Sequence, residues 1–326
     1  MVVGAGAVGG VVGARLAAAG REVVLVARGE HLAAIRRDGL RLRTPEGESG
    51  LRVPAVGSVS EVDWRPGDVA LLAVKSMDTA AVLAELAAYA DPETTVACLQ
   101  NAVANEPAAL RYFARVYGIC VMLPASHLEP GVVVQNCAPV PGILDLGRYP
   151  SGVDSRGEQL AADLRRAGFE SQPRPDIIRW KYNKLLMNLG NAVEALCGRV
   201  EGVDDAARLL RAEGESVLEA AGIAYVSQAE DRTRRGDLLQ LRPVAGVPRA
   251  GGSTWQSLAR GTGSVEADYL NGEIVWLARL HGVPAPGNEL VRRLVLRYAR
   301  EQRPPGSMAV AQLLAALRMA GLRVNA

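Results

Sequence analysis

The chain has 326 residues, of which 49% are hydrophobic and 22% are charged, and its formal net charge is +2. This length suits two domains with a core each, and this composition excludes a wholly disordered chain. A charge so close to neutral gives no electrostatic reason to expect a nucleic acid or a membrane surface as a partner.

Several absences narrow the class of protein further. The four cysteines, Cys98, Cys120, Cys137 and Cys197, lie far apart in the chain, and no histidine stands near them at the spacing of a metal site. Neither a disulfide framework nor a bound metal is therefore expected. The N-terminus has no basic segment typical of a signal peptide, and no run of about 18 apolar residues could cross a bilayer. These features predict a soluble, cytoplasmic protein.

The first predicted elements are a strand, a glycine-rich turn and a helix. The apolar residues 1–3 precede a G-x-G-x-x-G pattern, which leads into a predicted helix over 11–19 and a second strand over 22–27. In dinucleotide-binding proteins the first glycine allows a tight turn, the second admits the pyrophosphate, and the third lets the helix pack on the strand. The alternative is a glycine turn with a purely structural use. We interpret the pattern as a nucleotide site formed by Gly4, Gly6, Ala7, Val8 and Gly9.

Arg28 follows the second strand, at the position that selects between the two nicotinamide cofactors. NAD-specific sites usually have an acidic residue there for the ribose 2′-hydroxyl, whereas an arginine suits the 2′-phosphate of NADP. The sequence therefore favours NADP(H). Glu30 is close enough to keep NAD open, and an ordinary solvated arginine is the structural alternative.

The next part of the chain alternates strands and helices. A helix is expected over 30–38, short strands over 40–43 and 51–54 with a turn over 44–50, and a helix over 79–89. Residues 68–74 and 95–99 are continuous apolar runs, as in strands buried on both faces of a parallel sheet. Further strands are expected at 119–123, 132–134 and 142–146. This pattern predicts a doubly wound α/β sheet.

Two polar residues follow the buried strands directly. Lys75 comes after the strand at 68–74, and Asn101 follows the strand at 95–99 after one glutamine. Ligands of open α/β sheets lie outside the carboxyl ends of the strands, so both residues are candidates for contact with cofactor or substrate. Simple loop capping is the alternative for Asn101.

Helical patterns dominate the second half. They cover residues 160–167, 177–196, 206–221, 265–281 and 288–300. The proline-rich residues 172–175 suggest a linker, so we predict a nucleotide-binding domain over 1–172 and a helical domain over 173–326. Residues 241–254, rich in glycine and proline, are expected to form a loop that could cover a cleft.

The helical half contains a polar stripe headed by a lysine. The chain has only three lysines, Lys75, Lys181 and Lys184, among 37 basic residues. Arginine cannot release a proton, so a retained lysine is a candidate for chemistry. Lys184, Asn188 and Asn191 fall on one face of a predicted helix that is otherwise apolar, which suggests that they line a cavity rather than face solvent. A desolvated lysine there could protonate a carbonyl oxygen. A third segment contributes Ser253 and Glu266, although a glutamate near a helix start is more often a surface residue.

Four blocks of the sequence together resemble the ketopantoate reductases (2-dehydropantoate 2-reductases). Proteins of this family have a Rossmann-like domain and a helical domain of the 6-phosphogluconate dehydrogenase type. The resemblance rests on GAGAVGG (4–10) with VARGEHL (26–32), VKSMDT (74–79) with LQNAVANE (99–106), WKYNKLLMNLGNAVEAL (180–196) and the segment 253–286. It implies NADPH-dependent reduction of 2-dehydropantoate to (R)-pantoate, a step toward pantothenate and coenzyme A.

The resemblance also implies roles for single residues. Lys184 resembles the general acid and Glu266 its partner. Asn188 and Ser253 resemble substrate-binding residues, Ser253 toward the carboxylate, and Asn191 lies beside a further substrate-facing position. Lys75 and Asn101 resemble residues near the nicotinamide and the substrate.

Two positions depart from the family pattern and leave other functions open. Ala102 stands where the family usually has glycine, and Ala192 where relatives have a substrate-facing asparagine. A reductase of a different 2-oxo acid on the same scaffold is therefore the alternative, and an NADP(H)-binding protein without turnover is a third. The resemblance does not explain the tail over 303–326, whose apolar helix is expected to pack on its own domain or on a second subunit, as in a homodimer.

Overall fold

The computed structural model describes residues 1–247 and 251–322, and they form two compact units. The first unit contains residues 1–181 and 226–247, and the second contains 182–225 and 251–322. This division differs from the boundary expected at 172. The segment predicted as a linker is hydrogen-bonded along a strand instead, because the amide of Leu146 donates to Gln172 O (3.1 Å) and the amide of Arg174 donates to Leu146 O (2.7 Å).

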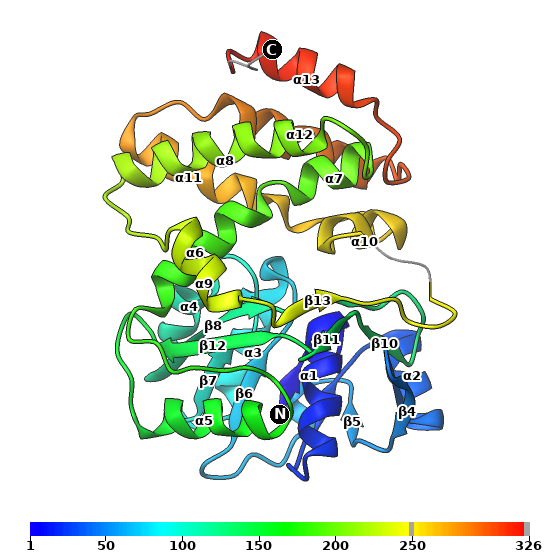
Figure 1. The fold of residues 1–326 in the computed structure, drawn as a ribbon. Helices are drawn as coiled ribbons and strands as arrows, with labels where there is room; N and C mark the ends of the chain where they lie inside the picture. The colour runs from blue at the N-terminus through cyan, green and yellow to red at the C-terminus, as the bar shows by residue number, and fades with distance from the viewer. Residues whose placement is uncertain (248–250, 323–326) are drawn as a thin grey trace. The chain divides into compact units, whose positions relative to one another are not determined.

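The first unit is built on a seven-stranded sheet in the order β12-β8-β7-β6-β1-β2-β5, which confirms the predicted doubly wound fold (Figure 1). All neighbours are parallel except β12 and β8. The strands are β1 (Val2–Val3), β2 (Leu25–Val26), β5 (Ala55–Val56), β6 (Val69–Leu72), β7 (Thr95–Cys98), β8 (Arg115–Met122) and β12 (Ile143–Arg148).

Helices cover both faces of this sheet, because neighbouring residues of a strand point to opposite sides. On one face, α1 (Ala7–Ala18) and α5 (Ser155–Arg166) pack in a core that includes Leu71 and Ala97. On the other face, α3 (Thr79–Tyr89) and α4 (Asn105–Leu110) pack in a core that includes Leu72 and Val96. The sequences of β6 and β7 are continuous apolar runs because both faces of each strand are buried. Helix α2 (Gly29–Asp38) follows β2.

A smaller sheet corrects one prediction. Its order is β4-β3-β10-β9, with β3 (Leu40–Thr44), β4 (Gly47–Leu51), β9 (Ala125–Ser126) and β10 (Val132–Gln135). The turn expected over 44–50 is only the tip of a hairpin, and the strand expected over 51–54 instead lies earlier, as β4. The sequence did not predict a strand at these residues because most of β4 is exposed to solvent and therefore lacks an apolar pattern.

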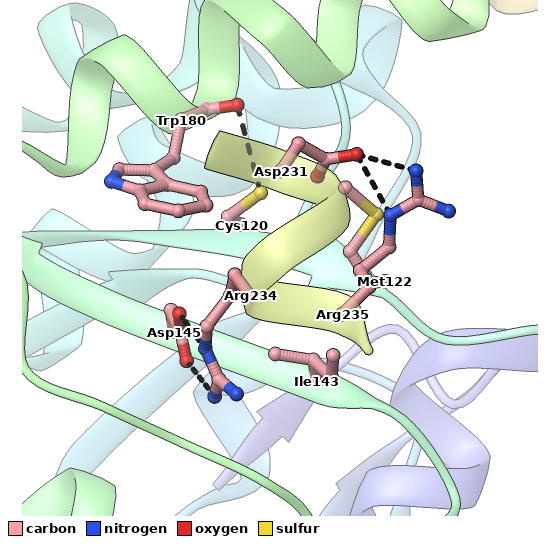
Figure 2. Close-up of a pocket in the computed structure, with 8 residues that line it drawn as sticks. All are labelled: Cys120, Met122, Ile143, Asp145, Trp180, Asp231, Arg234 and Arg235. Carbon is pink, nitrogen blue, oxygen red and sulfur yellow. Dashed lines mark hydrogen bonds and ion pairs between the residues drawn. The ribbon is translucent and has the colours of Figure 1, made fainter. Parts of the chain in front are cut away.

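Residues 226–247 return to the first unit after a long excursion. They contain α9 (Gln228–Arg235) and β13 (Leu239–Leu241), and β13 pairs with β11 (Cys137–Pro139). Figure 2 shows how α9 is held: Arg234 on this helix donates two hydrogen bonds of 2.8 Å to the buried carboxylate of Asp145 on β12. The same carboxylate also accepts from Arg174, at 3.2 Å. Of the loop predicted over 241–254, residues 248–250 lie outside the described part, and Ser253 already begins α10 (Ser253–Ala259).

The second unit is helical. Besides α10 and part of α6, it contains α7 (Asn191–Cys197), α8 (Val203–Ala220), α11 (Asn271–His281), α12 (Pro286–Arg300) and α13 (Val310–Met319). Helix α6 (Ile177–Asn188) begins in the first unit and continues into the second, where α8, α11 and α12 pack on one another (Figure 1). The tail helix α13 packs on α8 and α12 of its own unit through the buried side chains of Leu313 and Leu317.

Two helices predicted as continuous are each divided. The helix expected over 177–196 breaks between Asn188 and Asn191, and the one expected over 265–281 consists of a 3-10 turn, η3 (Glu266–Asp268), followed by α11. Within residues 1–247 and 251–322, no helix is long and apolar enough to cross a membrane.

The Asp145 ion pair gives a test of how the returning segment is held. Replacing Asp145 with asparagine removes the carboxylate that binds the guanidinium of Arg234, whose side chain is 9% exposed, and leaves Glu170, at 3.7 Å, as a more distant acidic neighbour. We expect the free energy of unfolding to fall by about 3 kcal/mol, measured by urea denaturation. The matched control is Asp163→Asn, because Asp163 pairs with Arg21 at a partly exposed site. That variant should lose less than about 1 kcal/mol, and equal losses in both variants would contradict this account.

Candidate active site

The glycine loop between β1 and α1 combines two tight contacts with one open position. A Cβ atom on Gly4, whose φ is +107°, would lie 2.8 Å from the amide nitrogen of Val74, and one on Gly9 would lie 2.1 Å from Gly4 O. A Cβ atom on Gly6 would meet nothing within 4 Å. The first and third glycines therefore serve close packing, and the second leaves space in front of the loop.

The N-terminus of α1 fits an anionic group in that space. Gly6 is the residue that caps this helix, and it supplies no side chain to the first amides; the first turn, which includes Ala7 and Val8, has no acidic residue. Amides at a helix N-terminus and the helix dipole both favour a phosphate. Arg28 is exposed at the N-terminus of α2, and its guanidinium has no acidic partner within the part of the chain that the structure describes. These residues fit a dinucleotide.

His31 supports the glycine loop, although no motif in the sequence predicted this role. Its Nε2 lies 2.7 Å from Ala5 O, its Nδ1 accepts a hydrogen bond of 2.9 Å from the amide of Gly131, and its ring lies 4.1 Å from that of His127. Because Nδ1 is an acceptor, Nε2 carries the proton and donates it to the loop carbonyl. Burial lowers the pKa of His31, which favours this neutral form. Its place in α2, after Arg28, is the only signal that the sequence offers.

Buried side chains hold the carboxyl ends of β6 and β7. The Gln100 amide donates to Val74 O (2.9 Å) and to the hydroxyl of Thr79 (2.8 Å), and the Asn105 amide donates to Asn101 O (2.9 Å). The chain segments that carry Lys75 and Asn101 are thus fixed by hydrogen bonds between these two strand ends. Lys75 and Asn101 themselves are half-buried.

Ala102 has the backbone conformation for which glycine is preferred. Its φ is +67°, although it is not a glycine, and its side chain is buried. A left-handed residue with a Cβ atom is strained by roughly 1–2 kcal/mol. An alanine at this position therefore has a physical cost, which the loop after Asn101 must sustain.

The polar stripe of the helical unit does not lie on one helix. Lys184 and Asn188 are one turn apart on α6, where Lys184 is half-buried and Asn188 is buried, but Asn191 begins α7. The prediction of a continuous stripe was therefore wrong. A Cβ atom on Gly190 would lie 3.0 Å from that of Ala207, so the glycine lets α8 approach the break closely.

Asn271 satisfies the backbone at this break. Its side-chain amide donates to Leu189 O (3.1 Å) and to the side chain of Asn288 (2.9 Å). Asn288 donates to Leu210 O (3.0 Å) and to the carboxylate of Glu213 (2.7 Å). Asn271 and Asn288 are both fully buried. This network joins the end of α6, directly after Asn188, to the start of α11.

The other two candidates of the helical unit are Glu266 and Ser253, which lie on segments that contact α11 and α7, respectively. Glu266 is 6% exposed and lies on η3, shortly before Asn271. Ser253 is the first residue of α10. The preceding amide, of Gly252, donates to the carboxylate of Glu194 on α7 (3.1 Å), and a Cβ atom there would lie 3.4 Å from the side chain of Asn191. The structure thus brings the start of α10 to the start of α7.

Within the described residues, no group of three or more His, Cys, Asp or Glu side chains is placed so that it could hold a metal ion. The four cysteines are buried and form no disulfide with one another.

Comparison with known proteins relates both halves of the chain to one family. The family described as "Ketopantoate reductase PanE/ApbA" matches residues 1–151, and "Ketopantoate reductase PanE/ApbA C terminal" matches residues 176–299. A 2-dehydropantoate 2-reductase of Pyrococcus horikoshii is 31% identical over 299 residues, which are 90% of this chain and 95% of that protein.

Solved structures have the same fold. The crystal structure of a PanE/ApbA family ketopantoate reductase from Ralstonia eutropha JMP134 is 31% identical, covers 93% of this chain and 100% of its own, and aligns with a TM-score of 0.76. D-Mandelate dehydrogenase, solved with NADH and anilino(oxo)acetate, is 22% identical, covers 93% and 99% of the two chains and has a TM-score of 0.78.

Removal of the Asn271 side chain tests whether it holds the helix break. The variant Asn271→Ala leaves Leu189 O without its buried donor, so we expect the free energy of unfolding to fall by about 2 kcal/mol. Asn136→Ala is the control, because within the described residues the side chain of Asn136 makes a single long hydrogen bond, of 3.5 Å, to Ser126. Urea denaturation measures the loss of unfolding free energy in each of the two variants. A loss in Asn271→Ala no greater than in the control would show that the break needs no side-chain donor.

Proposed function

Because the chain belongs to the ketopantoate reductase family, we propose that it reduces 2-dehydropantoate to (R)-pantoate with NADPH as the hydride donor. One observation carries this proposal. The similarity runs through both units, so it includes the glycine loop of the first and Lys184 of the second. (R)-Pantoate would then serve the synthesis of pantothenate and coenzyme A.

Residues of the first unit are proposed to hold the cofactor, which supplies the hydride when bound. The amides at the N-terminus of α1 would bind the pyrophosphate, in the space left open by Gly6. The guanidinium of Arg28 would bind the 2′-phosphate of NADPH, since planar guanidinium groups pair well with phosphate. Glu30 is also exposed in the first turn of α2 and would suit a ribose hydroxyl, so NADH is the competing cofactor. Lys75 and Asn101 are proposed to lie near the nicotinamide and the substrate.

Lys184 is proposed to be the general acid. A ketone oxygen gains negative charge as hydride arrives at its carbon, and a nearby ammonium group both stabilises this charge and neutralises it by giving up a proton. Lysine suits this role because its proton is transferable, unlike that of arginine. Glu266, a buried carboxylate, is proposed to hold the lysine and the substrate hydroxyl in place.

Polar side chains of the second unit are proposed to bind the substrate. Asn188 lies one turn after Lys184 on the same helix, which suits contact with the same small molecule. Ser253 begins α10, and its hydroxyl is proposed to donate to the substrate carboxylate. Asn191 lies beside the start of α10 and is assigned to the same substrate.

A reductase of another 2-oxo acid is the second candidate, and Ala192 favours it. This residue is 2% exposed on α7, so an apolar methyl group replaces the asparagine expected from the family pattern.

Loss of NADPH absorbance with a panel of 2-oxo acids separates the two functions. Oxidation of NADPH with ketopantoate alone supports the proposal, and preference for another 2-oxo acid would overturn it. Failure with every substrate would favour a protein that binds NADP(H) without turnover.

The proposed enzyme needs no metal, nucleic acid or membrane for this reaction, and we propose that it works in the cytoplasm. A homodimer stays a prediction. The exposed side chains of Trp276 and Leu280 on α11 are apolar groups that a second copy could cover.

The variant Lys184→Ala tests the general acid. We expect kcat to fall by about 10²- to 10⁴-fold, because the variant cannot deliver a proton in the transition state, while NADPH still binds. Steady-state kinetics and a fluorescence titration with NADPH measure the two effects. Lys184→Arg is the matched control for charge: it keeps the cation but not a transferable proton, so its kcat should also stay low. Undiminished turnover in either variant would refute this role.

The variant Arg28→Ala tests the choice of cofactor. Loss of a charged contact to the 2′-phosphate should raise KM for NADPH about tenfold or more and leave KM for NADH nearly unchanged. Arg36→Ala provides a control on the same helix, since Arg36 pairs with Glu61 (3.2 Å) at an exposed site. It should alter neither KM. An equal effect of Arg28→Ala on both cofactors would remove Arg28 from the phosphate site.

A further inference from the structure

Lys181, the lysine to which the proposed reaction assigns no role, forms a fully buried ion pair. Its Nζ lies 2.5 Å from Oε1 of Glu106 on α4, and the two side chains are 2% and 0% exposed. Both residues belong to the first unit, and Lys181 lies in α6, three positions before Lys184. A buried charge is costly unless it is paired, so each of these groups depends on the other.

The ammonium group of Lys181 also contacts the backbone of the central sheet. It donates to Gln100 O at 2.9 Å and more weakly to Ile119 O at 3.4 Å. Gln100 directly precedes Asn101, and Ile119 lies in β8. One side chain therefore joins α6 to the carboxyl end of β7 and to the neighbouring strand.

A glycine in β8 leaves room for this arrangement. A Cβ atom on Gly118 would lie 3.3 Å from Oε1 of Glu106 and 3.3 Å from Cδ of Lys181. Glycine in the interior of a strand weakens it and often marks the close approach of another group. Here the approaching group is the ion pair, which is in contact with α4, α6 and β8.

The stability of the fold alone does not explain why a buried ion pair, rather than a pair of apolar side chains, occupies these two positions. Burial raises the pKa of Glu106, which disfavours its charged form, and the ammonium group of Lys181 opposes this shift. Well-packed apolar side chains at such places are often as stabilising as a buried ion pair, or more so. What an apolar pair would lack is the donor to Gln100 O.

We propose that Lys181 and Glu106 are positioning residues of the reductase: Glu106 orients Lys181, and Lys181 fixes both the backbone at Asn101 and the start of the helix that carries Lys184. The inference rests on the proposed function, because Asn101 and Lys184 matter only as site residues. Neither positioning residue needs to contact cofactor or substrate. Misplacement of a reacting group by about 1 Å can cost about a hundredfold in rate.

Three variants separate positioning from stability. Lys181→Met keeps the stem without the charge, and the double variant Lys181→Met, Glu106→Leu also removes the carboxylate left alone. Arg234→Met is the matched control, since it breaks another buried ion pair of the same unit, with Asp145. Thermal unfolding, NADPH binding and kcat with ketopantoate are measured for each, well below the unfolding temperature.

We expect Lys181→Met to lower both thermal stability and kcat, kcat by about 10- to 100-fold, with NADPH affinity changed less than about threefold. The double variant should recover stability but not kcat, because Gln100 O still lacks its donor. Arg234→Met should lose stability and keep its kcat. Recovery of kcat together with stability in the double variant, or a similar loss of kcat in Arg234→Met, would overturn the proposal.

Amide hydrogen exchange gives a readout that does not need the substrate. Peptides that cover residues 99–106 should exchange faster in the double variant than in the wild type, and at the wild-type rate in Arg234→Met. If the wild type does not reduce ketopantoate, the proposed function fails, while this exchange still tests the positioning role. Unchanged exchange in the double variant would refute the fixing of the backbone at Asn101.

Discussion

The main constraint on the first unit is that backbone groups need partners where the parallel strands stop. The carbonyl groups of Val74, Gln100 and Asn101 lie beyond the last ladder residues of β6 and β7, and a buried carbonyl without a partner is costly. Side chains supply the missing donors, since Gln100 donates to Val74 O, Asn105 to Asn101 O, and Lys181 to Gln100 O. Side-chain donors thus hold these three carbonyl groups at the edge of the sheet where ligands bind in such folds.

The helical unit meets the same constraint at a helix break. Because α6 stops at Asn188, Leu189 O is free of the helix ladder and is bound by Asn271 instead. The chain of contacts continues through Asn288 to Glu213, which also accepts from the first amides of α12. In both units, then, a buried polar network lies next to residues assigned to the reaction. Such support holds reacting groups in place at little cost during the reaction.

Local patterns predicted much of the fold, and long-range contacts account for most of what they missed. The helix over 79–89 has the expected bounds, and the buried strands lie where apolar runs placed them. The return of residues 226–247 could not be foreseen, since α9 is polar and its partner Asp145 is distant in sequence. The break after Asn188 was also hidden, because the stripe fits an unbroken helix. For the site, the pattern predicted Lys184, whereas the roles of His31 and Glu106 depend on contacts with residues distant in sequence.

The most direct measurement is the fate of the transferred hydride. Ketopantoate would be incubated with the enzyme and NADPH that carries deuterium at both C4 positions of the nicotinamide ring. Mass spectrometry and proton NMR of the product then locate the label. Our account predicts (R)-pantoate with one deuterium at C2, because the hydride goes directly to the ketone carbon. Pantoate without deuterium, or no pantoate at all, would contradict it.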